Sequence, residues 1–515
     1  MPEVSVPEWF NAATYFVDRN VEEGRGNRVA ICYGDQEISY SQVAEQVNRA
    51  GNAFRELGVE IENRVMLILF DCPELVYSFW GAMKIGAVPV PVNTLMKPSD
   101  YQYLLNDSRA KVAVVSEALL PAIEPVLDTS PYLREVVVVG EAGKHRAFDD
   151  LVSGQPATLE AARTNKDDVA FWLYTSGTTG MPRAAVHLHH DMVYCTELYA
   201  KPILGITEND RTFSIAKLFF AYGLGNALYF PFAVGATTIL FPGRPEPKAV
   251  FDVVARHRPT VFYGVPTAYA GMLHAAEQGA GADMSSVRIA VSAGESLPAS
   301  IYQRWLERFG VQILDGIGST EILHIFLSNR ENEVRPGSSG KVVPGYEAKI
   351  VGDAGEPMPQ GEIGNLMIKG ESICAYYWCK HDQTKRAIQG QWMRTGDKYH
   401  VDEDGYFWYD GRSDDMLKVG GIWVSPMEVE AAIVEHPDVL ECAVVAQQDD
   451  DALVKPKAYV VLKDGENGRN DTAKGIQDFV KGRIAPYKYP RWVEFVDELP
   501  KTATGKIQRF KLRQT

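Results

Sequence analysis

The sequence predicts an α/β protein, with a large N-terminal domain of parallel-type sheets plus a β subdomain, and a small α+β C-terminal domain. Two features of the 515-residue chain carry this prediction. Apolar strand-like runs alternate with helical segments from residue 37 to residue 314, which is typical of largely parallel sheets. From about Lys341, glycine and proline become frequent and the strand-like runs shorten, which indicates an antiparallel subdomain.

The elements of the large domain follow from the spacing of apolar residues. Residues 37–40 indicate a short strand or turn. Apolar residues then recur at helical spacing from Val43 to Leu57, with Ser41 as the expected N-cap and Gly58 as the end. The same reasoning predicts strands at 64–70, 88–92, 112–115, 135–139, 169–174, 236–241, 260–263, 287–291 and 312–314, and helices at 73–86, 98–107, 189–201, 248–257, 266–278 and 298–308.

A compact tail of about 100 residues forms the expected small domain. We expect strands near 416–419, 439–446, 456–463 and 492–496, and helices from Pro426 and near 472–482. The chain has no internal repeat and no long low-complexity linker. We therefore expect a large domain over residues 1–411 and a small domain over residues 414–515, joined by a short hinge.

Composition excludes several classes of function. The formal net charge of −15 argues against broad nucleic-acid binding and against adsorption to anionic membranes. Residues 218–241 carry no charge over 24 positions, long enough to span a bilayer. However, Asn226, Pro231 and three glycines in this run favour a buried helix followed by a buried strand. No signal peptide is expected at the N-terminus.

The cysteines indicate a reducing compartment. Six of them are spread along the chain, and none forms a Cys-x-x-Cys pair. We expect buried thiols in the cytoplasm, with no disulfide framework.

The segment Tyr174–Arg183 is the first candidate for binding chemistry. An apolar run leads into it, and Thr175 to Gly180 are all hydroxyl residues or glycines. Small residues let backbone N–H groups approach an anion, and a following cation supplies charge to a phosphate. A mobile Ser/Thr/Gly surface loop is the alternative. The spacing of Gly177 and Gly180 does not fit a P-loop, and the chain has no Gly-x-Gly-x-x-Gly.

Four further segments rich in glycine or hydroxyl residues fall late in the chain. Two of them directly follow predicted strands, and open α/β sheets bind ligands beyond the carboxyl ends of their strands. We expect these two and the Tyr174–Arg183 segment to line one crevice. The four segments are Ser292–Ser296, Asp315–Glu321, Trp392–Asp397 and Pro500–Lys506.

The order of these motifs resembles the acyl-adenylate-forming enzymes, the superfamily of acyl-CoA synthetases, peptide-synthetase adenylation domains and luciferases. The resemblance covers nearly the whole chain. Within this superfamily the chain is most similar to benzoate- and hydroxybenzoate-CoA ligases, through Ala216–Asn226 and Ser319–Asn329. The motifs that carry the superfamily resemblance are Tyr174–Arg183, Gly318-Ser319-Thr320-Glu321, Thr395-Gly396-Asp397, Gly411-Arg412-x-Asp414 and Thr504-Gly505-Lys506.

The resemblance implies an ATP-dependent, AMP-forming ligation of an aromatic acid to coenzyme A through an acyl-adenylate. Thr320 would contact the α-phosphate and Glu321 would bind Mg²⁺. Asp397 and Arg412 would hold the ribose, while Gly294, Asp315 and Gly316 would flank the adenine. The β- and γ-phosphates would bind the loop formed by Thr175, Ser176, Gly177, Thr178, Thr179 and Gly180, with Arg183 after it.

The small domain would supply different cations to the two half-reactions. By the resemblance, Lys506 would bridge the acid carboxylate and the α-phosphate during adenylation. The domain would then rotate about Asp414 and present a second face with Lys418, Gly420 and Gly421 to the coenzyme A thiol. Taken alone, a lysine near a C-terminus such as Lys506 is more often an ordinary surface charge.

The acid pocket is expected to be mostly apolar. The resemblance assigns it Ala221, Tyr222, Gly318, His324 and Ile325. From the residues alone, Phe219, Phe220 and Tyr222 are equally well interpreted as core aromatic residues. For His324, a core histidine is the competing interpretation.

Two local features depart from a simple assignment. Arg183 stands where the family usually has lysine, which keeps the charge but changes its shape. The His187–Asp191 run resembles an acyltransferase His-x-x-x-Asp motif or a metal site, but no further Cys/His cluster supports a metal.

Two rival functions remain open. One is the same adenylation chemistry with another acid, aliphatic or substituted aryl, or with a carrier-protein acceptor. The other is a non-catalytic nucleotide-binding homologue. The expected partners are an aryl acid, ATP and coenzyme A, with no nucleic acid and no membrane insertion, and the oligomeric state is left open between monomer and homodimer.

Overall fold

The structure is a computed structural model that describes residues 4–175, 181–281, 283–412, 417–419, 422–449, 454–463, 470–484, 488–501 and 507–513. It divides into two compact units. Unit 1 comprises residues 1–347 and 369–393, and unit 2 comprises residues 348–368 and 394–515. The predicted boundary at residues 411–414 is not tested by this division and stays a prediction.

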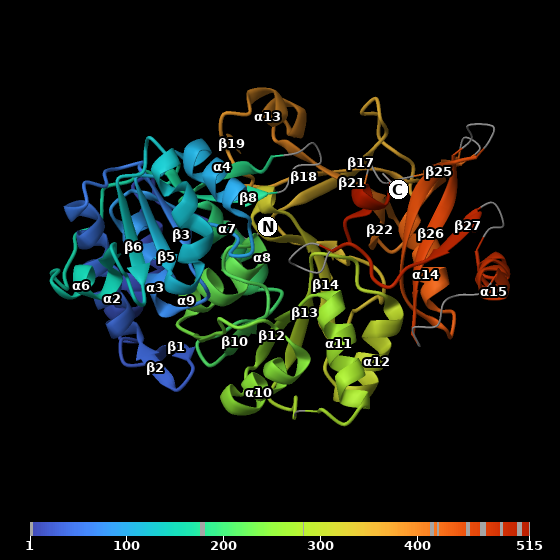
Figure 1. Cartoon of the computed structure of the whole chain (residues 1–515), viewed down its shortest axis with the longest axis horizontal. Helices are drawn as coiled ribbons and strands as arrows, with labels where there is room; N and C mark the ends of the chain where they lie inside the picture. The colour runs from blue at the N-terminus through green and yellow to red at the C-terminus, as the bar shows by residue number, and fades with distance from the viewer. Residues whose placement is uncertain are drawn as a thin grey trace. The chain divides into compact units, whose positions relative to one another are not determined.

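A five-stranded parallel sheet forms the first layer of unit 1 (Figure 1). Its strand order is β4-β3-β5-β6-β7, and every pairing in it is parallel. Valine-rich strands with both faces buried are what a covered parallel sheet requires. The bounds are β3 Arg64–Ile68, β4 Val88–Pro91, β5 Val112–Ser116, β6 Glu135–Val139 and β7 Arg146–Ala147.

Helices α2 and α3 pack against each other beside this sheet (Figure 1). Helix α2 (Tyr40–Glu56) begins with a capping box in which Ser39 Oγ accepts from Gln42 N and Gln42 Oε1 accepts from Ser39 N. The predicted N-cap at Ser41 is therefore wrong by two residues, because Ser39 is the residue with extended backbone. Helix α3 (Pro73–Lys84) begins at Pro73 as predicted.

The second sheet of unit 1 has nine strands in the order β16-β15-β14-β13-β12-β10-β11-β1-β2. The pairings from β14 through to β1 are parallel, and those at both edges are antiparallel. The bounds are β1 Val29–Tyr33, β2 Gln36–Ser39, β10 Arg211–Ser214, β11 Thr237–Leu240, β12 Val261–Gly264, β13 Ile289–Ser292, β14 Ile313–Gly318, β15 Ile325–Ser328 and β16 Lys341–Val342.

The remaining helices of unit 1 cover these sheets. Tyr269 of α11 and Trp305 of α12 pack in one hydrophobic cluster with Phe262 of β12, with ring centroids 4.8 Å apart between Tyr269 and Trp305. Residues 191–200 form α7 and a π-helical turn, so the helix predicted at 189–201 begins two residues later than expected. The bounds are α4 Pro98–Ser108, α7 Asp191–Cys195, η4 Thr196–Ala200, α10 Pro247–His257, α11 Pro266–Glu277 and α12 Ala299–Phe309.

The uncharged run 218–241 is a buried helical segment followed by a strand, as predicted. It contains α8 (Ala221–Leu224), η5 (Gly225–Tyr229), α9 (Phe230–Val234) and then β11. Among the residues that the structure describes, no helix combines the length and apolar character needed to cross a membrane.

A three-stranded antiparallel sheet, β19-β9-β8, completes the part of unit 1 that matters for the site. It comprises β8 Val169–Thr175, β9 Arg183–Leu188 and β19 Tyr376–Tyr377. The sequence predicted β8 but missed β9, together with β10 and β15. His187 of β9 contacts the carbonyl oxygen of Thr320, 133 residues away in the sequence, which short-range periodicity does not reveal.

Unit 2 is built mainly from antiparallel strands. Strands β21 (Trp392–Val401) and β22 (Phe407–Arg412) form an antiparallel pair, which agrees with the antiparallel subdomain predicted from about Lys341 onward. The C-terminal part has the β23–β24 hairpin (Leu417–Val419, Ile422–Val424) and the sheet β25-β26-β27. Its other bounds are β25 Val439–Gln448, β26 Val454–Leu462, β27 Trp492–Phe495, α14 Pro426–Val434 and α15 Asn470–Lys481.

The prediction of buried thiols is wrong for one of the six cysteines. Cys32, Cys72, Cys195, Cys374 and Cys442 are buried free thiols as expected, but Cys379 is exposed. It lies in the loop between β19 and α13 (His381–Ala387), with a positive φ of 49°.

Candidate active site

The ends of the Tyr174–Arg183 segment are held together by the β8–β9 pairing. Thr175 lies opposite Arg183, and Tyr174 lies opposite Ala184. The Tyr174 hydroxyl donates to Asp107 Oδ2 at 2.7 Å, which ties β8 to helix α4. The predicted phosphate-binding residues Ser176 to Gly180 lie outside the described residues. The end of β8 and the start of β9, which flank these residues, are thus paired next to each other in one sheet.

Thr320 and Glu321 lie in a short turn directly after β14. Ser319 caps this turn, since its Oγ accepts from the backbone N–H of Ile322 at 3.2 Å. The carboxylate of Glu321 lies 3.2 Å from Arg183 Nη2. The structure therefore brings together Arg183 and Glu321, which the sequence placed on phosphate and metal, respectively.

Tyr377 contacts both Glu321 and Arg183. The sequence analysis did not predict this residue as part of the site. Its hydroxyl donates to Glu321 Oε1 at 2.6 Å, and the Arg183 guanidinium carbon lies 4.0 Å from the centre of its ring. Burial, and next the Glu321 charge, raise the pKa of the Tyr377 hydroxyl. It therefore acts as a hydrogen-bond donor to the carboxylate at neutral pH.

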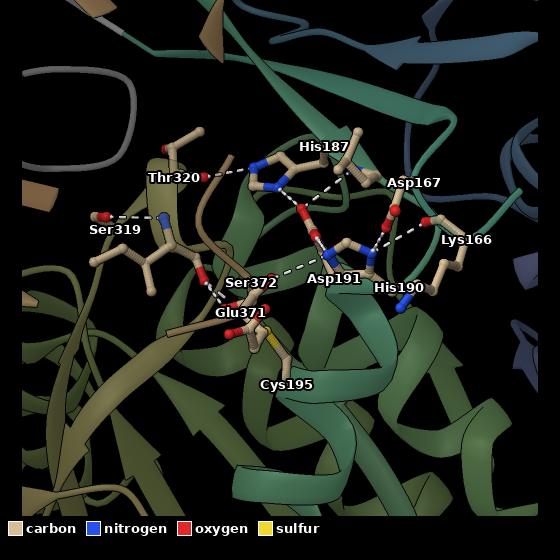
Figure 2. A network of polar contacts seen from close by, with 12 residues as sticks. Lys166, Asp167, His187, His190, Asp191, Cys195, Ser319, Thr320, Glu371 and Ser372 are labelled. Atoms are coloured by element: carbon tan, nitrogen blue, oxygen red, sulfur yellow. Dashed lines mark hydrogen bonds and ion pairs between the residues drawn. The ribbon is translucent and has the colours of Figure 1, made fainter. Parts of the chain in front are cut away.

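His187 of β9 and His190, shortly after this strand, belong to a buried polar network (Figure 2). His187 Nδ1 lies 2.7 Å from Asp191 Oδ2, and His187 Nε2 lies 2.8 Å from the carbonyl oxygen of Thr320. Both partners are acceptors, so both ring nitrogens donate when the ring is protonated. The network ties the turn that carries Thr320 to strand β9.

Asp191 is the centre of this network. It also lies 3.0 Å from His190 Nε2 and accepts from the backbone N–H of Leu188 at 3.1 Å. Burial alone would raise the pKa of Asp191, but hydrogen bonds from His187 and His190 lower it below its ordinary value. The i, i+4 spacing of His187 and Asp191 was visible in the sequence, and its use here is positional.

Of the residues predicted to flank the adenine, Asp315 lies in β14 and Gly294 lies shortly after the neighbouring parallel strand β13. Ser292 of β13 lies opposite Asp315 of β14, and Gly294 follows with a φ of +95° that favours glycine. Asp315 is 3% exposed, and its Oδ2 accepts from the backbone N–H of Leu297 at 3.3 Å. Burial raises the pKa of Asp315 to about 8, so the carboxyl is largely protonated at neutral pH.

Gly316 lies within β14, at a position where a side chain would not fit. A Cβ at this position would lie 2.6 Å from the carbonyl oxygen of Leu327 on the neighbouring strand β15.

The predicted acid-pocket residues gather around His324. This side chain is 2% exposed, and its Nε2 lies 3.1 Å from Asn226 Oδ1. Its ring centroid lies 5.7 Å from that of Tyr222 and 4.5 Å from that of Phe230. Burial lowers the pKa of His324 to about 3, so the ring is neutral in a largely aromatic surrounding.

The neighbours of His324 explain why small residues recur here. A Cβ on Gly225 would collide with the His324 ring, and one on Gly318 would lie 2.6 Å from the carbonyl oxygen of His324. The Tyr222 hydroxyl donates to the carbonyl oxygen of Val291, at 3.0 Å. The other predicted pocket residues, Ala221 and Ile325, are 8% and 1% exposed, respectively. The role of Asn226 and Gly225 was not predicted, although both lie within the Ala216–Asn226 motif.

Unit 2 holds the predicted ribose pair. Asp397 and Arg412 lie opposite each other on β21 and β22, with Arg412 Nη1 3.1 Å from Asp397 Oδ1. The cross-strand pairing brings these two predicted residues together.

Among the predicted residues of the small domain, the structure describes the backbone of Lys418. Lys418 lies in β23, where its backbone pairs with Trp423, and its side chain is not described. Asp414, Gly420, Gly421 and Lys506 lie outside the described residues.

Comparison with known proteins decides the family. A model of the AMP-binding enzymes matches residues 17–378, and a model of the AMP-binding enzyme C-terminal domain matches residues 428–506. The chain belongs to the AMP-binding enzyme family. The superfamily inferred from the motifs is confirmed.

Relatives and solved structures agree with this assignment. The chain is 50% identical over 514 residues to the benzoate–CoA ligase of Thauera aromatica, covering 99% of this chain and 97% of the relative. It is 44% identical to a 4-hydroxybenzoate–CoA/benzoate–CoA ligase of Rhodopseudomonas palustris, with 98% and 94% covered.

Among solved structures, the anthranilate CoA ligase AuaEII in complex with anthranoyl-AMP has a TM-score of 0.95 at 46% identity, covering 99% of this chain and 98% of that one. A benzoate CoA ligase from Burkholderia xenovorans has a TM-score of 0.91 at 46% identity, covering 98% of this chain and all of that one. The predicted fold class is thus confirmed.

Proposed function

We propose that this protein is an AMP-forming aryl-CoA ligase that joins an aromatic acid of the benzoate or hydroxybenzoate class to coenzyme A. The observation that carries the proposal is the buried aromatic surrounding of a neutral His324, next in the chain to the turn that bears Thr320 and Glu321. The 50% identity over nearly the whole length to a benzoate–CoA ligase supports it.

The chemistry explains what the protein must do. The acid carboxylate attacks the α-phosphorus of ATP, and pyrophosphate leaves with the electrons of the broken P–O bond. The coenzyme A thiol, on losing its proton, then attacks the acyl carbon of the adenylate and AMP leaves. Neither step requires a protein nucleophile, so the catalytic task is to position anions and stabilise charge.

Glu321 is the proposed magnesium ligand. Within the described ranges, no group of three or more His, Cys, Asp or Glu side chains could hold a metal ion. A single carboxylate fits Mg²⁺, which takes one or two protein carboxylates and completes its shell with water and substrate phosphates. When bound there, the ion would neutralise phosphate charge.

The remaining nucleotide contacts are proposals from the same motifs. Thr320 contacts the α-phosphate, and its carbonyl is held by His187. Asp397 accepts from the ribose hydroxyls with Arg412 beside it, and Gly294, Asp315 and Gly316 flank the adenine. The loop from Thr175 to Gly180, with Arg183 after it, holds the β- and γ-phosphates.

The small domain serves the two steps in turn. Lys506 assists adenylation, and Lys418 lies on the face used for thioester formation. We place the hinge at Asp414, between a large domain of residues 1–411 and a small domain of residues 414–515. Action in the cytoplasm follows from the cysteine usage, and the oligomeric state stays open.

An acid panel tests the function directly. Benzoate, hydroxy-, amino- and fluorobenzoates and short fatty acids are incubated with ATP, Mg²⁺ and coenzyme A, and the thioester is measured by mass spectrometry. We expect aryl thioesters; products from aliphatic acids alone would overturn the aryl assignment.

Two further readouts separate the rival functions. Acid-dependent ATP–pyrophosphate exchange distinguishes an enzyme from a nucleotide binder. Product formation that requires free coenzyme A distinguishes a ligase from a carrier-loading enzyme.

A further inference from the structure

Glu321 is held by two donors that converge on one oxygen. Its Oε1 lies 3.2 Å from Arg183 Nη2 and 2.6 Å from the Tyr377 hydroxyl. The carboxylate is buried, with the residue 8% exposed, so its charge depends on these partners. We call Arg183, Tyr377 and Glu321 the Glu321 clamp.

The backbone sets the geometry of the clamp. Tyr377 pairs with Ala185, two residues after Arg183, in the β19–β9 ladder. Neighbours two apart on a strand point to the same face, so the guanidinium reaches the face on which the Tyr377 ring lies. The guanidinium carbon lies 4.0 Å from the ring centre, within the range of a cation–π contact.

Lysine would not reproduce this arrangement. A guanidinium is planar, stacks on an aromatic face and presents several donors, whereas an ammonium is a compact and strongly hydrated point charge. Arg183 Nε is buried and makes no hydrogen bond to any residue within the described part of the chain. The side chain therefore keeps donor capacity for an anion while Nη2 contacts Glu321.

We propose that, in the Glu321 clamp, Arg183 and Tyr377 occupy Oε1 of Glu321, the carboxylate oxygen that Mg²⁺ needs. The metal and the nucleotide must therefore displace these two side chains from Glu321 before the site is complete. This inference rests on the proposed function. A divalent cation bound to Glu321 would repel the Arg183 guanidinium. The β- and γ-phosphates of ATP, which the proposed function assigns to the adjoining loop, would attract it. Arg183 thus exchanges a carboxylate for a phosphate partner, and the exchange raises the Mg²⁺ concentration that nucleotide binding requires.

The test is the metal dependence of ATP binding, measured by isothermal titration calorimetry over a series of free Mg²⁺ concentrations without acid or coenzyme A. The variants are Arg183→Lys, Tyr377→Phe and the double variant. Tyr376→Phe is the matched control, because the neighbouring Tyr376 is 37% exposed and pairs on the same strand. Thermal unfolding checks that each variant is folded.

We expect Arg183→Lys and Tyr377→Phe each to lower the half-saturating Mg²⁺ concentration for ATP binding by about three- to tenfold, since each releases one charged hydrogen bond from Glu321. The double variant should show less than the product of the two effects, because both donors share Oε1. Tyr376→Phe should match the wild type.

An unchanged half-saturating Mg²⁺ concentration in both single variants would overturn the clamp, and so would an equal shift in Tyr376→Phe. If one single variant does not fold, the other decides alone. Absence of ATP binding by the wild type at saturating Mg²⁺ would instead reject the proposed function, so the two failures are distinct.

Discussion

His187 Nε2 lies 2.8 Å from the carbonyl oxygen of Thr320, while Nδ1 of the same ring lies 2.7 Å from Asp191. The contact joins strand β9 to a turn 133 residues further along the chain. His187, His190 and Asp191 therefore hold the backbone that presents Thr320 and Glu321.

We expect His187→Gln to lower kcat for acid-dependent ATP–pyrophosphate exchange by about tenfold, with the KM for the acid close to that of the wild type. The substitution loosens the Thr320 backbone without touching the aromatic surrounding of His324. The free energy of unfolding should fall by ~1–3 kcal/mol through the buried polar groups left without partners.

His189→Gln is the control for this prediction. His189 is equally buried, but its Nδ1 accepts a hydrogen bond from the backbone N–H of Ala12. An equal loss of kcat in both variants would mean that the effect is only one of stability.

His324→Ala should change the acid profile more than the use of ATP. The ring packs between Tyr222 and Phe230, so its removal enlarges the space beside the proposed ring site. We expect kcat/KM for benzoate to fall by about tenfold or more relative to larger substituted acids, with the KM for ATP within about twofold. Thioester formation across the acid panel provides the measurement. An unchanged order of preference among the acids would mean that His324 only contributes to packing.

Asp315→Asn should stabilise the protein relative to the wild type more at pH 8 than at pH 6. Burial raises the pKa of Asp315 to about 8, whereas the carboxyl in the unfolded chain has a pKa of ~4. Between pH 4 and pH 8 the unfolded state therefore binds fewer protons, so this residue makes stability fall as pH rises.

The Asp315→Asn substitution removes this pH dependence of stability, because asparagine does not titrate. The difference between variant and wild type should grow by ~2 kcal/mol from pH 6 to pH 8, measured by urea unfolding. A difference that stays constant over this range would show that Asp315 does not titrate there.

Lys506→Ala should abolish adenylation but spare thioester formation from supplied aroyl-AMP. The reason is that only the first step brings a carboxylate against a phosphate, where a bridging cation is needed. Lys418→Ala should show the opposite pattern. Pyrophosphate exchange and coenzyme A consumption measure the two steps separately, and equal loss of both steps in the Lys506 variant would contradict the two-face assignment.

The sequence predicted the architecture well wherever local periodicity was strong. Strand β6 and the start of helix α3 lie where apolar runs and Pro73 indicated them. Such elements are specified by contacts within the element or by its burial on both faces. The N-cap at Ser39 was missed because Ser39 and Ser41 offer the same side chain, and only the backbone conformation separates them.

The motifs in the sequence by themselves determined the family, the order of the candidate site residues and the chemistry to expect. Only the tertiary structure decided what those residues touch: Arg183 contacts Glu321 and Tyr377, and His187 holds Thr320. These pairs lie more than 130 residues apart. A one-dimensional pattern records which chemical groups are present, whereas their pairing and their pKa shifts arise from burial and distance, which exist only once the chain is folded.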